Sequence, residues 1–255
     1  GAPQNGRSAL DGVEAMNMMV NMMREHMDEE ARIHYVITKG GLAPNVVPEE
    51  AEVYYYVRHP EVEGVKELFN RVVMTAEGAA RGTETQMTFE VMHGNYPLMP
   101  NKTLSSLIDE ELNMLGGITY NDEENAFAAE IYKTLLNPDS VIGDQQNIAP
   151  LVLSQTKGST DVGDVSWKVP TSGVRIATWV PGTSSHSWQA VAAGGTTIGT
   201  KGSTLAAKAL ANSAMRLYLE PKIIEDAWTE HKENIGDHEY AALLGDRKPP
   251  LDYRK

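Results

Sequence analysis

The chain has 255 residues, enough for one large domain or two small ones, and no apolar run approaches the ~20 residues of a membrane-spanning helix. Its formal net charge of −13 argues against nucleic-acid binding, which requires a basic surface. The absence of cysteine excludes disulfides and thiolate metal sites within this chain, and it fits a reducing, cytoplasmic location.

The first third of the chain alternates between helical and strand periodicity. Apolar residues recur at steps of three and four in a predicted helix, namely Leu10, Val13, Met16, Val20, Met23 and Met27. Residues 31–38 and 51–59 alternate with a period of two, which is typical of strands. Pro60 opens a second predicted helix, and residues 83–94 alternate again as a third strand.

This order of elements predicts a ferredoxin-like α+β domain that lacks its first strand. A complete unit runs strand, helix, strand, strand, helix, strand, and residues 1–96 contain all but the first of these. We therefore expect the chain to begin inside a domain.

From residue 95 onward the pattern changes. Helices are predicted over 102–115 and 122–136, the second opened by Asn121 with acidic residues in its first turn. Residues 172–180 predict a short strand buried on both faces, and residues 203–221 predict a helix of mostly small residues.

Two glycine-flanked loops contain the polar side chains most typical of a functional site. Asp161 lies in GSTDVGDVSW, and His186 lies in PGTSSHSWQ, directly after the predicted strand. Because α/β enzymes place site residues just beyond strand ends, His186 is a candidate metal ligand. Taken alone, Asp161 is also explained as a turn or capping residue, and His186 as a surface histidine.

Other histidine-based sites have less support. His34 points away from the apolar side of its strand, which favours a histidine on a solvated sheet face. A triad of Ser185, His186 and an aspartate lacks a nucleophile elbow.

Four motifs, spread over nearly the whole chain, together resemble the aminoacylase/carboxypeptidase-type family of dinuclear zinc metallopeptidases, in its amidohydrolase branch. They are GRSALDGVEAMN, GGLAPNVVPEEAEVYYYVRHP, GSTDVGDVSW and PGTSSHSWQAVAAGG. In that family a ferredoxin-like lid, which mediates dimerisation, interrupts an α/β catalytic domain. The resemblance implies that residues 1–96 are this lid without its first strand, and that residues 97–255 are the C-terminal part of the catalytic domain.

The resemblance also implies a role for His186 as the last ligand of a two-zinc centre, in which manganese or cobalt could replace zinc. The family's HxD motif, its paired glutamates and most metal ligands precede the lid, so they would lie outside this chain. Asp161 matches an aspartate that orients neighbouring groups, and Gly182 a position where the backbone approaches the substrate. Many members have a glutamate shortly after the last ligand, where this chain has Gln189 and Val191, so support of that ligand is expected to differ.

Asn45 and Arg58 match lid residues that in some members contact the substrate carboxylate or the developing oxyanion. An arginine donates two parallel hydrogen bonds to a carboxylate, and an asparagine amide can donate to an oxyanion without carrying charge. On the residues alone, Asn45 is also explained by turn chemistry beside Pro44, and Arg58 by a surface charge at a strand end.

The implied reaction is metal-dependent hydrolysis of the amide bond in N-acyl amino acids or dipeptide-like substrates with a free carboxylate, aminobenzoyl-glutamate being one candidate. The expected assembly is a homodimer through the lid domain, with a second kind of subunit as a further partner. Since one histidine cannot hold zinc tightly, we expect the chain by itself to be an inactive fragment of that enzyme. The alternative is a non-catalytic dimerisation or ligand-binding module.

Overall fold

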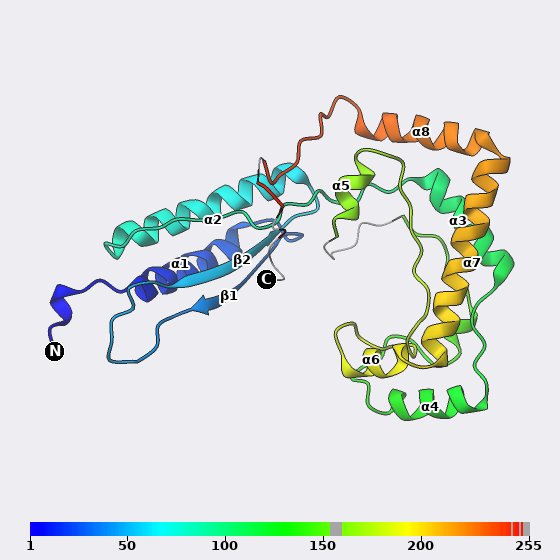
Figure 1. Ribbon diagram of the computed structural model, residues 1–255, viewed down its shortest axis with the longest axis horizontal. Helices are drawn as coiled ribbons and strands as arrows, with labels where there is room; N and C mark the ends of the chain where they lie inside the picture. The colour runs from blue at the N-terminus through cyan, green and yellow to red at the C-terminus, as the bar shows by residue number, and fades with distance from the viewer. Residues whose placement is uncertain (154–159, 246, 250, 252–255) are drawn as a thin grey trace. The chain divides into compact units, whose positions relative to one another are not determined.

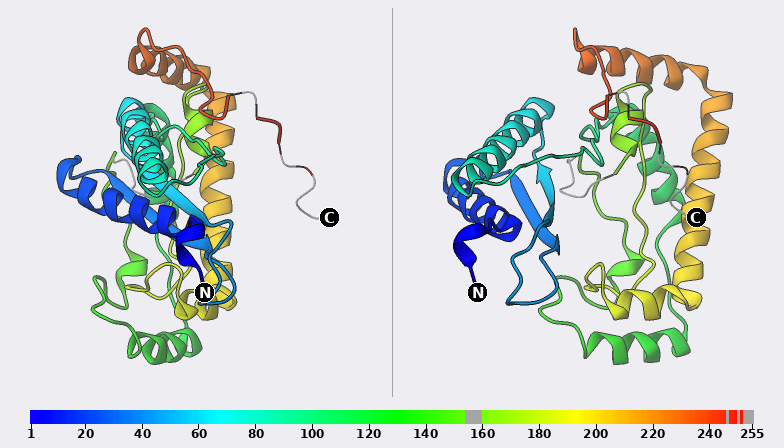
Figure 2. Two further views of the ribbon diagram at one scale, coloured as in Figure 1. Left: turned by 90° about the vertical axis from the view of Figure 1, so that its left-hand side faces the viewer. Right: turned by 60° about the vertical axis from the view of Figure 1, so that its left-hand side comes forward.

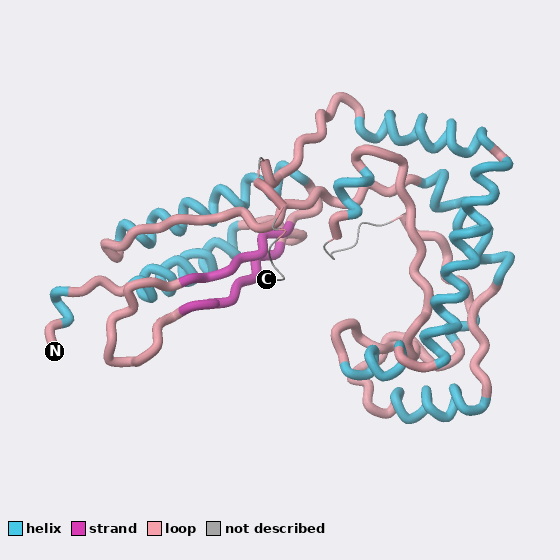
Figure 3. Tube along the Cα trace, viewed as in Figure 1, coloured by secondary structure: helices cyan, strands magenta, loops and turns pink. Residues whose placement is uncertain are grey.

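The computed structural model describes residues 1–153, 160–245, 247–249 and 251. These residues form two compact units, each with its own core (Figure 1). The first contains Gly1–Pro97, Thr160, Asp161 and the described part of the tail from Ala241, and the second contains the other described residues. Helices predominate beside one small sheet, a mixture that agrees with the predicted α/β class (Figure 3).

Two helices pack on one face of a two-stranded sheet in the first unit. Its elements are η1 (Pro3–Asn5), α1 (Ala9–Met23), η2 (Arg24–His26), β1 (Arg32–Lys39), β2 (Glu52–Arg58) and α2 (Val62–Gly82). The strands are antiparallel, with Ile33 opposite Val57 and Tyr35 opposite Tyr55. The predicted order helix, strand, strand, helix is therefore confirmed, although α2 begins two residues after Pro60.

The core of the first unit lies between the sheet and both helices. Its buried residues are Val20, Met23, Ile33 and Val72. Tyr55 packs against this cluster and donates its hydroxyl to Asn17 Oδ1 at 2.5 Å. Burial raises the pKa of the Tyr55 phenol above its ordinary value of 10. Ile33 and Tyr55 lie on the sheet face that period-two alternation predicts to be apolar.

The third predicted strand is wrong. Residues 85–94 have no strand structure, and within the described part of the chain the sheet consists of β1 and β2 alone. A strand requires a hydrogen-bonded neighbour, which alternation of side chains cannot supply. The segment instead packs against α2, where the rings of Phe69 and Phe89 lie 5.8 Å apart.

The second unit is helical. Its elements are α3 (Lys102–Leu115), α4 (Asp122–Tyr132), η3 (Asp144–Gln146), α5 (Val162–Ser166), α6 (Trp188–Gly194), α7 (Thr197–Leu219) and α8 (Pro221–Ile235). Helix α7 packs against α3, α6 and α8, and Figure 2 shows it as the long helix between α6 and α8. Among the residues that the structure describes, no helix is both long and apolar enough to cross a membrane.

Helix predictions in this unit succeed where local start signals are strong. The helix over 102–115 is confirmed as α3, and the one over 203–221 is contained largely in α7, which begins earlier. The patterns did not predict α5, α6 and α8, although Pro221 opens α8 and a capping serine precedes α6.

Helix α4 begins as predicted but ends early. The side chain of Asn121 accepts from Glu124 N, and Glu124 Oε2 accepts from Asn121 N, both at 2.8 Å, which completes a capping box. The predicted end at residue 136 is wrong, because the helix stops at Tyr132. Asn137 has a positive φ of 49° directly before Pro138, a residue that disfavours helical backbone before it.

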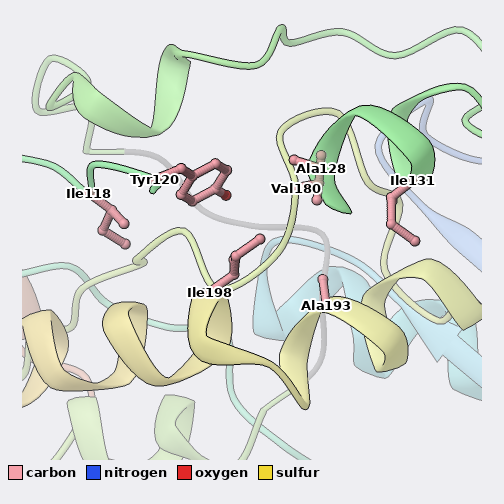
Figure 4. Close-up of a cluster of buried hydrophobic side chains, with 7 residues drawn as sticks. All are labelled: Ile118, Tyr120, Ala128, Ile131, Val180, Ala193 and Ile198. Carbon is pink, nitrogen blue, oxygen red and sulfur yellow. The ribbon is translucent and has the colours of Figure 1, made fainter. Parts of the chain in front are cut away.

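The largest core of the second unit joins α4, α6, α7 and the loops between them (Figure 4). Its buried residues are Ile118, Tyr120, Ala128, Ile131, Val180, Ala193 and Ile198. The strand predicted over 172–180 is wrong, because no strand ladder forms on these residues in the described structure. Its apolar residues Ile176 and Val180 still pack into this core, so the pattern predicted burial but not pairing.

Replacing Glu124 by glutamine should destabilise the second unit by about 2 kcal/mol at neutral pH, because a charge-assisted hydrogen bond in a buried setting is lost. Glu124 is 4% exposed, and its Oε2 accepts from Lys201 Nζ of α7 at 2.5 Å. The Lys201 hydrogen bond is the main cause that lowers the pKa of this carboxyl from 4.5 to about 2. A depressed pKa stabilises the fold fully above pH 4.5, and this contribution is lost as the pH falls toward 2.

Urea denaturation of wild type and of Glu124→Gln between pH 2 and pH 7 tests this expectation. The matched control is Glu130→Gln on the same helix, which removes an exposed ion pair with Lys133 and should change stability by less than about 0.5 kcal/mol. The role of the buried Glu124–Lys201 pair would be contradicted if Glu124→Gln and Glu130→Gln lost the same free energy of unfolding. It would also be contradicted if the stability difference between wild type and Glu124→Gln did not become smaller in acid.

Candidate functional site

His186 lies in the loop between residues 172–180 and α6, and its side chain is exposed. The loop turns back on itself, because Thr183 N donates to Val180 O at 3.1 Å and Ser187 Oγ donates to Ser184 O at 2.7 Å. His186 has a φ of 59°, in the left-handed region that residues other than glycine seldom occupy. Such strain costs about 1–3 kcal/mol and persists only when the surroundings impose it.

Gly182 occupies a position in this loop that only glycine fits. Its φ is 81°, and a Cβ there would lie 2.6 Å from Pro138 Cβ and 3.0 Å from Ser140 O. The glycine thus allows the loop to pack closely against residues 138–140. This contact explains the residue structurally, and its approach to a substrate stays a prediction.

Asp161 is exposed and directly precedes α5. The first residues of its motif, 158–159, lie outside the described residues. A neighbouring carboxylate that the motif analysis did not select, Asp164, accepts a hydrogen bond from Tyr240 Oη at 2.8 Å. Asp164 therefore has a structural role, whereas the orienting role of Asp161 stays a prediction.

Asn45 lies in the exposed loop that joins β1 to β2. Val46 N donates to Ala43 O at 3.2 Å, so Pro44 and Asn45 are the central residues of a turn. Turn chemistry accounts for the backbone here, and the exposed amide remains accessible to a ligand.

Arg58 is the last residue of β2, where it stands opposite Arg32. Its guanidinium carbon lies 5.4 Å from the centroid of the Tyr56 ring, a cation–π contact. Asn45 lies beyond the other end of the same strand. At about 3.3 Å per residue, the seven residues of β2 separate the two ends by roughly 20 Å. The hairpin therefore does not bring Asn45 and Arg58 together within one chain.

Three further histidines are accounted for by their surroundings. His34 is exposed on the face of β1 away from the core, as predicted. The His59 ring contacts two partners: its Nε2 lies 3.1 Å from Asp28 Oδ2, and its Nδ1 accepts from the backbone N–H of Glu61. These two contacts hold the chain in place just after Arg58. His231 is buried on α8, and burial lowers its pKa. Sequence reasoning missed the last two, because their partners are distant in the chain or form part of a core.

A complete metal centre does not arise from the described residues. Among them, no three histidine, aspartate or glutamate side chains are grouped so that they could hold a metal ion. Catalytic zinc normally has three protein ligands. His186 is exposed and could contribute one imidazole, so the residues present fit part of a centre at most.

Comparison with known proteins defines the first unit. Residues 1–84 match the model of the peptidase dimerisation domain, a range that contains both helices and both strands of the unit. Residues 1–84 are therefore similar to a peptidase dimerisation domain. Over 91% of its residues it is 36% identical to the B subunit of p-aminobenzoyl-glutamate hydrolase from Escherichia coli (strain K12), of which the match covers 54%.

Two dipeptidases are also similar to most of the chain. It is 28% identical to the Xaa-Arg dipeptidase of Mus musculus over 90% of its residues, and 26% identical to that of Homo sapiens over 93%. The matches cover 47% and 48% of those proteins, so the chain spans about half the length of its relatives. These matches confirm the family resemblance that the four motifs indicated, and the relatives are hydrolases by name.

Proposed function

We propose that this chain is part of a metal-dependent hydrolase that cleaves the amide bond of an N-acyl amino acid or a dipeptide-like substrate. The observation that carries this proposal is the 36% identity to one polypeptide of a hydrolase over 91% of the chain. The substrates named for the relatives, p-aminobenzoyl-glutamate and Xaa-Arg, each contain an amide bond to an amino acid with a free carboxylate. We take aminobenzoyl-glutamate as the first substrate to test.

His186 is the residue we assign to metal binding. Its imidazole is exposed, and its own backbone has a left-handed φ of 59°, as expected where the surroundings impose strain to present a side chain. Two zinc ions, with manganese or cobalt as substitutes, would supply Lewis acidity and an ionised water. Most of their ligands would come from outside this chain, since the described residues contain no complete site.

The other candidate residues would bind and orient the substrate. Arg58 would bind the substrate carboxylate, and Asn45 would donate a hydrogen bond to the oxyanion. The backbone at Gly182 would lie next to the substrate, and Asp161 would orient neighbouring groups. Because β2 separates Asn45 and Arg58 by roughly 20 Å, one small substrate cannot contact both in a single hairpin. If both act on one substrate, they come from different copies of the chain.

The partners follow from the dimerisation domain. We propose a cytoplasmic homodimer formed through the lid domain, residues 1–96, with residues 97–255 as the C-terminal part of the catalytic domain. Since the bacterial relative is named as one of the subunits of its hydrolase, a different polypeptide is proposed as a further partner. With a net charge of −13, we expect binding to neither nucleic acid nor membranes.

A non-catalytic dimerisation or ligand-binding module is the second candidate. Two observations favour it. Residues 1–84 match a dimerisation domain, and among the described side chains no three potential ligands are grouped so that they could hold a metal ion. The two candidates differ in whether the longer protein, of which we propose this chain is a part, binds zinc and hydrolyses amide bonds.

Zinc content and hydrolysis of p-aminobenzoyl-glutamate should be measured for the present chain and for the full-length gene product. We expect the present chain to have neither bound zinc nor activity, and the full-length protein to have both. A full-length protein without metal and without amidase activity would support the second candidate. Activity of the present chain alone would contradict the placement of the other ligands outside it.

A further inference from the structure

A cavity of about 380 Å³ lies in the first unit, between residues 26–28 and helix α2. Clefts that bind small molecules have volumes of about 300–1,000 Å³. The side chains that matter for binding are both charged and apolar, and they are Asp28, His59, Gly64, Glu67, Leu68 and Arg71. All of them belong to the first unit, so the cavity is complete without the second unit.

His59 forms a fixed wall of this cavity. Its side chain is 8% exposed, and its Nδ1 accepts from Glu61 N at 3.0 Å, so Nε2 carries the proton and donates to Asp28 Oδ2 at 3.1 Å. The ring packs directly on Gly64, where a Cβ would lie 2.2 Å from His59 Nδ1. The bond from His59 holds the Asp28 carboxylate at the cavity, and the second oxygen of this exposed carboxylate can still accept from a ligand.

Arg71 brings a positive charge to the cavity that no described residue neutralises. Its side chain is half-buried, and it makes no hydrogen bond or ion pair within the described part of the chain. Glu67 lies one turn earlier on α2, at a spacing that allows an ion pair, yet the two side chains form none. Charged groups that lose contact with water are normally paired. The half-buried guanidinium and the carboxylate beside it are therefore suited to a ligand that carries both kinds of charge.

We propose that this cavity binds a free basic amino acid, with L-arginine as the ligand to test. The ligand carboxylate would accept from the Arg71 guanidinium, whose planar fork donates two parallel hydrogen bonds to a carboxylate. The two cationic groups of the ligand would bind the carboxylates of Glu67 and Asp28. The methylene groups between them would pack on Leu68, which is 4% exposed and forms an apolar part of the lining.

The balance of charge favours a basic amino acid over an acidic one. Apart from its histidines, the lining has one positive side chain, Arg71, and two negative ones, Asp28 and Glu67. A basic amino acid carries the opposite set at neutral pH, one negative and two positive groups. Glutamate would bring two carboxylates to a cavity that already has two, and the chain's net charge of −13 would repel it further. Binding requires no catalytic activity, so the site can be tested separately from the proposed hydrolase.

Isothermal titration calorimetry of the present chain with L-arginine, agmatine and L-glutamate tests the proposal. Agmatine is arginine without its carboxylate, so wild type should bind L-arginine about 10-fold or more tightly than agmatine, and L-glutamate least tightly. Arg71→Gln should weaken binding of L-arginine about 10-fold or more but leave agmatine unaffected. Glu67→Gln should weaken both, because both ligands keep their cationic groups. The matched controls on the same helix are Arg81→Gln and Glu77→Gln, at exposed residues outside this cavity, and they should change neither affinity.

Three results would overturn the proposed site. The first is no detectable binding of L-arginine by wild type at ligand concentrations up to about 10 mM. The second is equal weakening in Arg71→Gln and Arg81→Gln, which would show general attraction to the helix and no specific contact. The third is equal affinity of wild type for L-arginine and agmatine, a comparison that needs no variant and so decides the role of Arg71 even if circular dichroism shows that Arg71→Gln is unfolded.

Discussion

Replacing His186 by alanine should abolish amide hydrolysis by the full-length protein and lower its zinc content. Loss of a group that merely supports a metal ligand costs about 10–100-fold in affinity or activity, so loss of a ligand should cost about 100-fold or more. Metal analysis together with turnover of p-aminobenzoyl-glutamate measures both effects. Unchanged zinc and unchanged turnover would overturn the assignment of His186.

Two matched variants separate a metal-binding role from a structural one. His186→Gly should also lose activity and zinc, yet its fold should be no less stable, because glycine adopts a φ of 59° without steric cost. His34→Ala removes an exposed histidine from β1 and should leave activity and zinc unchanged. If His186→Gly retained activity and zinc, the imidazole would not be a metal ligand, and only the left-handed course of the backbone, which glycine preserves, would matter at this position.

Replacing Gly202 by alanine should destabilise the second unit by about 1–3 kcal/mol, the usual cost of overpacking. A Cβ at this buried position of α7 would lie 2.4 Å from Ala177 O and 2.7 Å from Thr178 Cγ2. In an unhindered helix interior the same change stabilises by about 1 kcal/mol, so the sign of the effect is diagnostic.

Thermal unfolding followed by circular dichroism measures this change. The control is Gly173→Ala, where no atom lies within 4 Å of the added Cβ and the effect should stay within about 0.5 kcal/mol. A Gly202→Ala protein more stable than wild type would show that the close contact between α7 and residues 177–178 does not constrain the unit.

Elements that depend on neighbours within a few residues could be predicted from the sequence. The alternation around Ile33 and Tyr55 identifies the buried face of the sheet, and the Asn121 capping box marks the start of α4. Both features are local, because a cap spans three residues and strand alternation needs only the geometry of the backbone. Order along the chain likewise made the family resemblance recognisable, although no single motif was specific.

The geometry of the candidate site could not be predicted from neighbouring residues in the sequence. The sequence places His186 in a loop after an apolar segment, but its left-handed backbone and exposure follow from how that loop folds against its surroundings. The same holds for Asn45 and Arg58, which are close in the sequence but lie at opposite ends of a hairpin strand. Whether they act at one site depends on contacts between chains.

By itself, the sequence determined the helices and strands with strong local signals, the apolar face of the sheet and the family resemblance. Only the tertiary structure decided that residues 85–94 and 172–180 form no strand, that Gly182 and Gly202 have no room for a side chain, and that Arg71 lines a cavity. The physical reason is that strand pairing, close backbone contact and exposure each depend on residues far away in the sequence, whereas helix caps and alternation depend only on neighbours.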